Sequence, residues 1–242
     1  MSHPILALWT VPRSSSTAFE RMMMERGDHA VVHEPFSLHY YFGTDRRSPR
    51  FDERRPRSSP TEILADLESA ALDRPVFVKD MAAHVRDIAD ERFLARFTHT
   101  FLVRDPAWSL PSLAEQWPDF TDEEAGYEPL AELVDAAIES GSPATIVDTD
   151  DLRSDPAAVV EAYCEAVGIP FLPAALTWTP GMADQWELWD DWHREVAGSR
   201  GFEPPPSEPA PRLRTSRARA AYQLCAPIYE RLRVLRLRPT HR

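Results

Sequence analysis

Two periods of hydrophobic and polar positions alternate along this chain, and they predict strands followed by helices. Short apolar runs of the kind found in buried strands lie at residues 6–11, 29–33, 75–80, 98–103 and 144–148. Apolar residues at helical spacing predict helices that begin near residue 14 and then cover residues 61–72, 85–97, 107–115, 128–140 and 157–167. This order predicts an α/β fold of three layers, in which helices flank a mostly parallel, five-stranded sheet.

The last third of the sequence is helical, with an interruption. A predicted helix at 182–196 carries a stripe of three tryptophans and a valine, which is more typical of a packed core than of a cofactor site. A proline-rich crossover at 203–211 leads to a basic amphipathic helix at 215–237, within a C-terminal helical extension at 212–242. Residues 43–60 have no periodicity, and we expect an exposed loop there that could act as a mobile lid.

Length and composition narrow the class of protein. The 242 residues fit a single domain over 1–242, and the net charge of −12 argues against a nucleic-acid-binding protein. No apolar stretch is long enough to cross a membrane, and no secretory signal opens the sequence. Cys164 and Cys225 fall in helical segments and are expected to be reduced core residues. We therefore expect a cytoplasmic protein.

The turn after the first strand carries the chemistry around which the chain is organised. Pro12 ends the apolar run, and one cation and four hydroxyls follow before the helix continues: Arg13, Ser14, Ser15, Ser16 and Thr17. The first N–H groups of a helix are unpaired and its dipole is positive there, so this turn predicts a site for phosphate. The alternative is an ordinary serine-rich helix cap. The glycines and lysine of a Walker A loop are missing.

Charged residues follow three further strands. Glu34 comes after the second strand, and Pro35 favours an extended backbone for it. Lys79, the only lysine of the chain, lies in the third strand run. Arg104 ends the fourth strand, and Ser112 lies eight residues later. Open α/β sheets bind ligands at the carboxyl ends of their strands, so we expect these side chains to share one site, although structural ion pairs would also explain them.

The aromatic run at 39–42 allows two interpretations. It can form the wall of a substrate pocket or a patch of packed core. The residues alone do not separate the two, and both stay open at this point.

Together, these motifs resemble those of sulfotransferases that use 3′-phosphoadenosine-5′-phosphosulfate (PAPS). A basic residue and hydroxyls after Pro12 resemble the 5′-phosphosulfate loop of the family, and Arg104 with Ser112 resembles its 3′-phosphate pair. The turn at 150–156, before a helix that ends at Gly168, and the segment 199–202 also resemble family features. The resemblance covers most of residues 5–202 and implies a P-loop NTPase-like sulfotransferase fold.

The resemblance also implies which residues hold the cofactor. The predicted PAPS-binding residues are Arg13, Ser14, Ser15, Ser16, Thr17, Ala18, Arg104, Ser112, Arg200 and Gly201. Ser15 stands where the family often has glycine, and Ala18 where it often has an aromatic residue that stacks on adenine. No metal is expected, because the chemistry requires none.

In-line sulfonyl transfer needs a base and cations. The resemblance implies that Arg13 and Lys79 neutralise charge on the leaving group and the sulfonate. Glu34 is the favoured base, and His84, five residues after Lys79, is the second candidate. A buried Glu34 would need a raised pKa to act near neutral pH.

The predicted function is therefore transfer of a sulfonyl group from PAPS to a hydroxyl or amine of a small-molecule acceptor. We expect no nucleic-acid or membrane partner. The sequence leaves the oligomeric state open, and a homodimer is one of the alternatives. Two alternatives remain. One is a nucleotide-dependent phosphotransferase, and the other is a non-catalytic relative that binds PAPS or another nucleotide.

Overall fold

The computed structural model describes residues 2–207 and 210–239. Residue 1, residues 208–209 of the predicted proline-rich crossover, and residues 240–242 of the predicted C-terminal extension lie outside the described residues.

A five-stranded sheet in the order β2-β3-β1-β4-β5 forms the centre of the fold, and every pairing in it is parallel. Its strands are β1 (Ile5–Thr10), β2 (Ala30–His33), β3 (Val76–Met81), β4 (Thr98–Val103) and β5 (Thr145–Asp148). β1 is buried along its whole length, as expected for a parallel strand covered on both faces. The predicted α/β sheet is confirmed, and it is wholly rather than mostly parallel.

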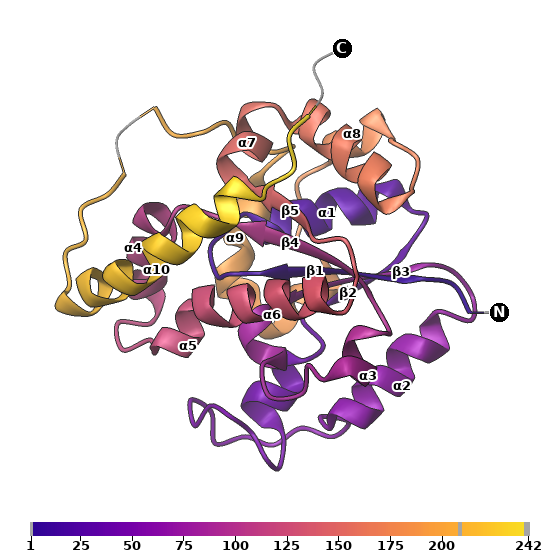
Figure 1. The fold of residues 1–242 in the computed structure, drawn as a ribbon, viewed down its shortest axis with the longest axis horizontal. Coiled ribbons are helices and arrows are strands. Elements are labelled where there is room, and N and C mark those ends of the chain that lie inside the picture. The colour runs from indigo at the N-terminus through magenta and orange to yellow at the C-terminus, as the bar shows by residue number, and fades with distance from the viewer. Residues whose placement is uncertain (1, 208–209, 240–242) are drawn as a thin grey trace.

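Helices cover both faces of the sheet (Figure 1). Ile5, Ala7 and Trp9 of β1 face one hydrophobic cluster, and Leu6 and Leu8 face the other. The first cluster includes α2 (Pro60–Ala70), α3 (Glu91–Leu94), α4 (Pro106–Gln116), α6 (Tyr127–Glu139) and α10 (Ser216–Val234). The second includes α1 (Ser16–Arg26), α8 (Pro156–Val167) and the 3₁₀ helix η3 (Pro173–Leu176).

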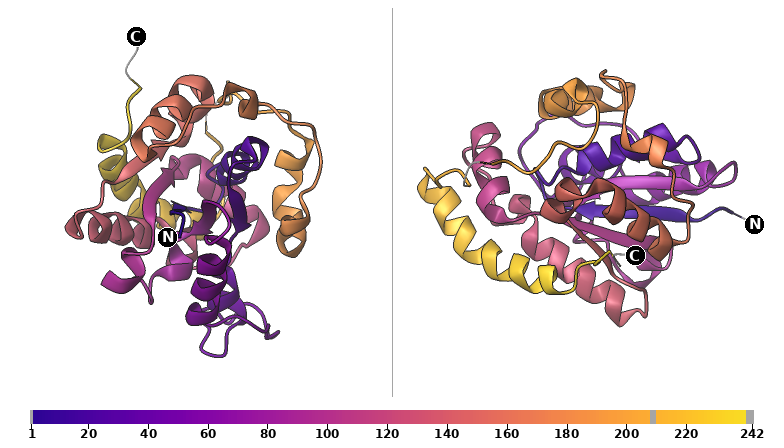
Figure 2. Two further views of the ribbon diagram at one scale, coloured as in Figure 1. Left: turned by 90° about the vertical axis from the view of Figure 1, so that its right-hand side faces the viewer. Right: turned by 90° about the horizontal axis from the view of Figure 1, so that it is seen from above.

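Shorter elements connect these layers. They are the π-helix η1 (Leu38–Phe42), the 3₁₀ helices η2 (Ala82–Val85) and η4 (Asp184–Trp189), and the α-helices α5 (Asp122–Ala125), α7 (Thr149–Ser154) and α9 (Asp190–Gly198). Figure 2 shows α9, in orange, on the same side of the sheet as α1.

Two predicted helices are wrong in part. Residues 85–97 contain only the last residue of η2 and the short helix α3 instead of one helix. The carboxylate of Asp90 accepts a hydrogen bond from the N–H of Phe93 and starts a new helix there. The predicted helix at 182–196 begins as the 3₁₀ helix η4 and becomes α-helical only from Asp190.

Residues 43–59 contain no helix or strand but are attached to the body at defined points. Arg50 forms two hydrogen bonds to the carboxylate of Glu124, at 2.8 Å and 2.7 Å, and its guanidinium lies 4.1 Å from the ring centre of Trp117. Phe51 packs against Trp189. The loop therefore rests against the residues that follow α4 and against η4, and a role as a lid stays a prediction.

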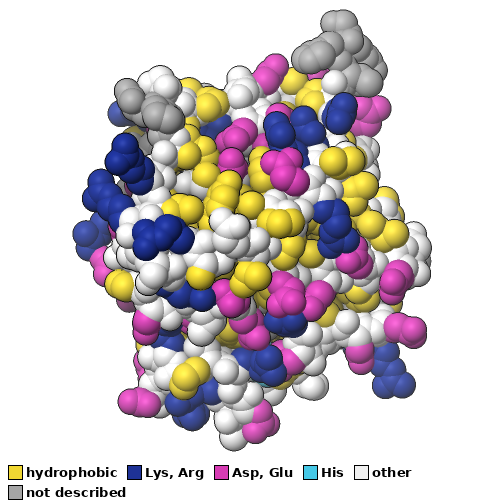
Figure 3. Space-filling view, turned by 60° about the vertical axis from the view of Figure 1, so that its left-hand side comes forward, with side chains coloured by type: hydrophobic (Ala, Val, Ile, Leu, Met, Phe, Trp, Pro, Cys, Tyr) yellow, Lys and Arg dark blue, Asp and Glu magenta, His cyan; other side chains and the backbone are white. Residues whose placement is uncertain are grey.

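The C-terminal helix α10 packs mainly against α4 and α6. The hydroxyl of Tyr229 donates to Asp148 at the end of β5, at 3.0 Å, which ties the helix to the sheet. Cys164 and Cys225 are buried and free. Positive and negative side chains are interspersed on the face shown in Figure 3. Within residues 2–207 and 210–239, no helix has the length and apolar character needed to cross a membrane.

Candidate active site

The turn between β1 and α1 has a backbone conformation that suits an anion. Arg13 and Ser15 have φ angles of 61° and 64°, whereas Ser14 between them does not have a positive φ. Left-handed residues in such a turn help to direct backbone N–H groups into one concavity. Ser15 is the N-cap of α1 but forms no side-chain capping hydrogen bond, so it leaves the first N–H groups of the helix to other partners.

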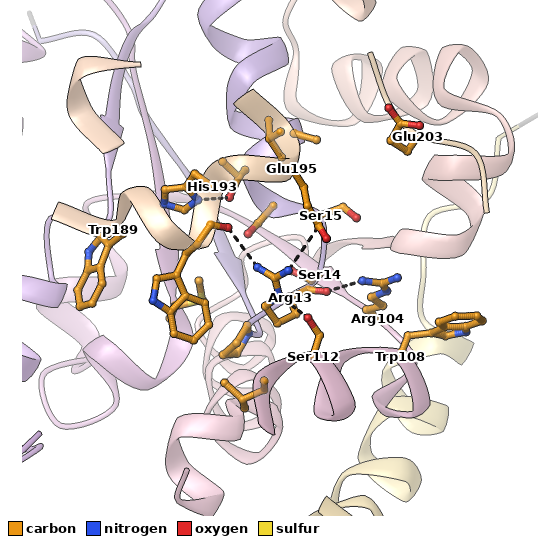
Figure 4. A pocket seen from close by; sticks show the side chains of 18 of the residues that line it. Arg13, Ser14, Ser15, Arg104, Trp108, Ser112, Trp189, His193, Glu195 and Glu203 are labelled. Atoms are coloured by element: carbon orange, nitrogen blue, oxygen red, sulfur yellow. Dashed lines mark hydrogen bonds and ion pairs between the residues drawn. The ribbon is translucent and has the colours of Figure 1, made fainter. Parts of the chain in front are cut away.

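Side chains from distant parts of the chain converge on this turn (Figure 4). Nε of Arg13 donates to Oγ of Ser112 on α4, and Nη1 of Arg104 donates to the carbonyl oxygen of Arg13, both at 2.7 Å. Because Ser112 accepts from Arg13, its own hydroxyl proton remains available to another acceptor. The structure therefore brings together the predicted turn and the predicted arginine–serine pair.

Two buried polar atoms at this place fit an anionic ligand. Oγ of Ser14 and Nε of Arg104 have no hydrogen-bond partner among the described residues. Burial, together with the nearby charge of Arg153, lowers the pKa of Arg104. A phosphate bound against these groups would accept their hydrogen bonds and compensate the buried positive charge.

One cavity of about 910 Å³ joins these groups to the candidate bases. Glu34 and His84 line it as well. Of the predicted cofactor-binding residues, those that line this cavity are Arg13, Ser14, Ser15, Ser16, Thr17, Ala18, Arg104, Ser112 and Gly201.

The structure departs from the prediction at Arg200. Its side chain is exposed and does not line the cavity. Backbone pairing with residues 177–178 holds this segment in place. The carbonyl oxygen of Arg200 accepts from the N–H of Trp178, and Gly201 pairs with Thr177. Arg153 on α7 lines the cavity and contributes a positive charge there.

Glu34 and Lys79 form a buried ion pair between the neighbouring strands β2 and β3. Nζ of Lys79 donates to Oε1 of Glu34 and lies 3.9 Å from Oε2 of Glu20. The backbone of Glu34 is not extended as predicted but has a φ of 40°. Its N–H donates to the carbonyl oxygen of Lys79, and its own carbonyl oxygen accepts from the N–H and hydroxyl of Ser37. These bonds outweigh the preference for extended backbone that Pro35 imposes.

The pKa of Glu34 is shifted in the direction opposite to the one that a base near neutral pH would need. Burial by itself would raise the pKa of this carboxyl group, but the positive charges of Lys79 and His33, with smaller effects from other histidines, lower it well below its ordinary value. The raised pKa that Glu34 would need to act as a base near neutral pH is therefore not present in this arrangement. Glu34 is held as a carboxylate, which is the form that can accept a proton, but it is a weak base while Lys79 is paired with it.

His84 lines the same cavity as Glu34. Its Nδ1 is 2.6 Å from Oδ1 of Asp80, and Asp80 also accepts from the backbone N–H groups of Phe36 and Met81. A buried carboxylate that holds one imidazole nitrogen fixes the ring and its tautomer. His84 therefore keeps the geometry of a candidate base, beside Tyr40 and Tyr41.

Three buried polar residues of this region were not among the candidates from the sequence. Glu20 is fully buried on α1, and its Oε2 lies 2.8 Å from Nδ1 of His33. Nε2 of His33 lies 3.2 Å from Nε2 of His193. The sequence pattern could have indicated that His193 is buried. It lies four residues after Trp189 and three before Val196, on the apolar stripe of that segment.

Aromatic side chains form the other end of the cavity. Tyr41, Trp117 and Trp189 line it, together with Met81 and Leu113. Nε1 of Trp189 is buried without a partner among the described residues. Of the aromatic run at 39–42, Tyr41 therefore lines the cavity, while Phe42 packs in a core cluster with Trp189.

The arrangement can bind an anion at one end and move a proton at the other. Arg13 and Arg104 lie at the turn, and the carboxylate of Glu34 and the imidazole of His84 line the same cavity. In the part of the chain that the structure describes, no cluster of three or more histidine, cysteine or acidic side chains could hold a metal ion.

Known proteins resemble this chain in both sequence and fold. Two proteins of Arabidopsis thaliana, named branched-chain-amino-acid aminotransferase-like protein 1 and 2, are 25% identical over 214 residues and 27% identical over 221 residues. The alignments cover 86% and 85% of this chain but only 38% and 37% of those longer proteins. The sulfotransferase domain of the Synechococcus PCC 7002 olefin synthase is 15% identical and superimposes with a TM-score of 0.53, over 93% of this chain and 95% of that domain.

The family follows from a match that spans nearly the whole chain. A model of the family described as sulfotransferase domain matches residues 4–234, which include the anion-binding turn, the arginine–serine pair and both candidate bases. The chain belongs to the sulfotransferase domain family.

Proposed function

We propose that this domain transfers a sulfonyl group from PAPS to a hydroxyl or amine of a small-molecule acceptor. One observation carries the proposal. Arg13, Arg104 and Glu34 line one cavity, while Lys79, which does not line it, pairs with Glu34. This supports a site in which an anionic donor and a proton acceptor are held together. This combination suits transfer of an anionic group to a nucleophile that must lose a proton.

The donor half of the cavity would hold the two phosphate groups of PAPS. Arg13 and the hydroxyls of the turn would bind the 5′-phosphosulfate, and Arg104 with Ser112 the 3′-phosphate. The unpaired Oγ of Ser14 and Nε of Arg104 support this arrangement, since an anion would satisfy both.

The residues have distinct roles in the transfer. PAPS supplies a sulfonyl group whose bond to the bridging phosphate oxygen breaks as the acceptor oxygen or nitrogen bonds to sulfur. Glu34 takes the proton that the acceptor loses, and His84 is the alternative base. Lys79 and Arg13 neutralise the charge that grows on the sulfonate and on the leaving phosphate.

The aromatic end of the cavity favours an acceptor with an apolar body. Tyr41, Trp117 and Trp189 would contact such a body, and the unpaired Nε1 of Trp189 offers one donor to an oxygen atom of the acceptor. We expect the acceptor to be neutral or cationic, because the chain has a net charge of −12.

Calorimetric titration tests the donor. Wild type and Arg104→Ala are titrated with adenosine 3′,5′-bisphosphate, with ATP and Mg²⁺, and with 5′-AMP. Loss of charge-assisted hydrogen bonds at Arg104 should weaken binding of the bisphosphate by about 30-fold or more. Arg231→Ala, which removes an exposed arginine paired with Asp135 on α6, is the matched control and should bind like wild type.

Other outcomes would favour the alternatives. If ATP with Mg²⁺ binds more tightly than the bisphosphate, and Arg104→Ala does not change that affinity, the proposal is contradicted and a phosphotransferase is supported. Binding of the bisphosphate without turnover of PAPS over a panel of hydroxyl and amine acceptors would support a non-catalytic relative.

A further inference from the structure

A line of hydrogen bonds connects the anion-binding turn to the buried carboxylates. Oγ1 of Thr17 lies 3.2 Å from Nδ1 of His193, Nε2 of His193 lies 3.2 Å from Nε2 of His33, and Nδ1 of His33 lies 2.8 Å from Oε2 of Glu20. The side chains of His33 and Glu20 are 3% and 0% exposed. Because water is excluded there, each hydrogen bond must have one donor and one acceptor.

Charge balance favours a doubly protonated His33. Glu20 and Glu34 carry two negative charges, Lys79 carries one positive charge, and all three groups are buried. His33 lies between the two carboxylates, with Nδ1 at 2.8 Å from Glu20 and Nε2 at 3.8 Å from Oε1 of Glu34. A doubly protonated His33 makes the cluster neutral, and an uncompensated buried charge is strongly unfavourable.

The proton of His33 then determines the tautomer of His193. If Nε2 of His33 donates, Nε2 of His193 must accept and cannot carry a proton. His193 is then a neutral ring with its proton on Nδ1, which donates to Oγ1 of Thr17. Burial, with Lys79 and His33 nearby, lowers the pKa of His193 to about 3, which agrees with a neutral ring.

Other groups facing the two rings are compatible with this assignment. The indole of Trp186 donates from Nε1 to Oε2 of Glu20 and lies 5.3 Å from the ring of His193, so it adds no charge. Burial and the positive charges of Lys79, His33 and Arg13 lower the pKa of His193 and outweigh the carboxylate of Glu34, which acts to raise it.

We propose that His193 is a positioning residue that, by donating to Oγ1 of Thr17, turns the Thr17 hydroxyl into a hydrogen-bond donor toward the anion-binding turn. A hydroxyl whose oxygen already accepts directs its own proton to the next acceptor, which is the donor phosphosulfate in the proposed function. The opposite tautomer would take the proton of Thr17 and present oxygen lone pairs to an anion. The inference rests on the proposed function for its ligand but not for its proton positions.

Nuclear magnetic resonance of the ligand-free protein tests the proton positions directly. Nitrogen-15 spectra of histidine side chains distinguish the two neutral tautomers from the doubly protonated ring, and the two signals are assigned from His33→Gln and His193→Gln variants. At pH 7 we expect a doubly protonated His33 and a neutral His193 with its proton on Nδ1. A neutral His33, or a His193 with its proton on Nε2, would overturn the proposal whether or not the protein binds PAPS.

A double-mutant cycle tests the effect on binding. His193→Phe and Thr17→Val should each weaken binding of adenosine 3′,5′-bisphosphate about fivefold to tenfold, and the double variant should be no weaker than either single variant. His193→Asn, whose amide can place an N–H near the position of Nδ1, should bind within about twofold of wild type. Binding of 3′-AMP, which lacks the 5′-phosphate, should not change in any variant.

The outcomes separate the two proposals. Additive losses in the double variant, or equal losses for His193→Phe and His193→Asn, would reduce His193 to a packing role and contradict the inference. If wild type does not bind the bisphosphate, the proposed donor is wrong, and the nitrogen-15 spectra alone decide the proton positions.

Discussion

Replacing Glu34 by glutamine isolates the charge of this carboxylate while keeping its shape. Glu34 is 7% exposed and accepts from Lys79, which is completely buried. Glutamine can still accept from Lys79 but carries no charge, so the buried lysine loses its nearest counter-ion. Removing one partner of a buried pair costs about 3–5 kcal/mol, and we take the lower end, about 3 kcal/mol, because Glu20 stays near Lys79. For a chain of this length, that loss lowers the melting temperature by about 6–12 °C.

The pH dependence of this loss has a defined sign. The folded protein lowers the pKa of Glu34, so the stability it contributes is complete above the ordinary carboxyl pKa and is lost as the pH falls toward the folded value. The difference in unfolding free energy between wild type and Glu34→Gln should be constant near neutral pH and shrink below about pH 4.5. Chemical denaturation at several pH values measures it, with Glu187→Gln, an exposed glutamate outside the cavity, as the control.

Activity and binding complete the test of Glu34. If it is the base, turnover with PAPS and an accepted substrate should fall by about 10²–10⁴-fold in Glu34→Gln. Affinity for adenosine 3′,5′-bisphosphate should fall by no more than about tenfold, since Glu34 does not contact the arginines of the turn and acts on binding only through the charge of His33. Turnover within about threefold of wild type would refute the role of Glu34 and make His84→Ala the next variant.

Three further predictions concern the turn and the loop. Ser15→Gly should raise the free energy of unfolding by about 0.5–1 kcal/mol in chemical denaturation, because Ser15 has a positive φ that glycine adopts without strain. Arg50→Ala should cost about 2 kcal/mol and speed proteolysis within residues 43–59, because the buried Glu124 loses two hydrogen bonds. Glu195→Gln should tighten binding of adenosine 3′,5′-bisphosphate about twofold in calorimetry, because this exposed carboxylate lies 3.4 Å from Arg13 and competes with an anion. Unchanged values in any of these assays would contradict the corresponding argument.

The sheet could be predicted because its strands are buried on both faces and separated by clear helical patterns. The fourth strand was predicted with the bounds it has, residues 98–103. The helix at 85–97 could not be placed correctly, because one side-chain cap at Asp90 decides where a turn becomes a helix. The π-helix η1 has no periodicity that separates it from an ordinary aromatic cluster.

The meeting of the site residues could also be predicted, for a topological reason. Arg13, Glu34 and Arg104 follow strands of one parallel sheet, and all three line one cavity. Contacts made from outside the sheet could not be predicted, because no pattern links residues as distant as His33 and His193, which are 160 positions apart. The positive φ of Glu34 likewise depends on its hydrogen bond to Lys79, a tertiary contact that the local sequence does not contain.

The lowered pKa of Glu34 raises the question of how such a weak base could act, and the causes of the shift supply an answer. Burial has the largest effect and acts to raise the pKa of Glu34. Among the charges that lower this pKa, that of Lys79 has the largest effect. Lys79 is buried next to Glu34 and does not line the cavity itself. In the proposed reaction its ammonium group would have to turn toward the sulfonate of the bound donor, which would weaken its pairing with Glu34. Burial would then dominate and make Glu34 a stronger base. Proton transfer from the acceptor would thus depend on a loaded donor site, since the same lysine that suppresses the base in the free protein stabilises the charge of the group to be transferred.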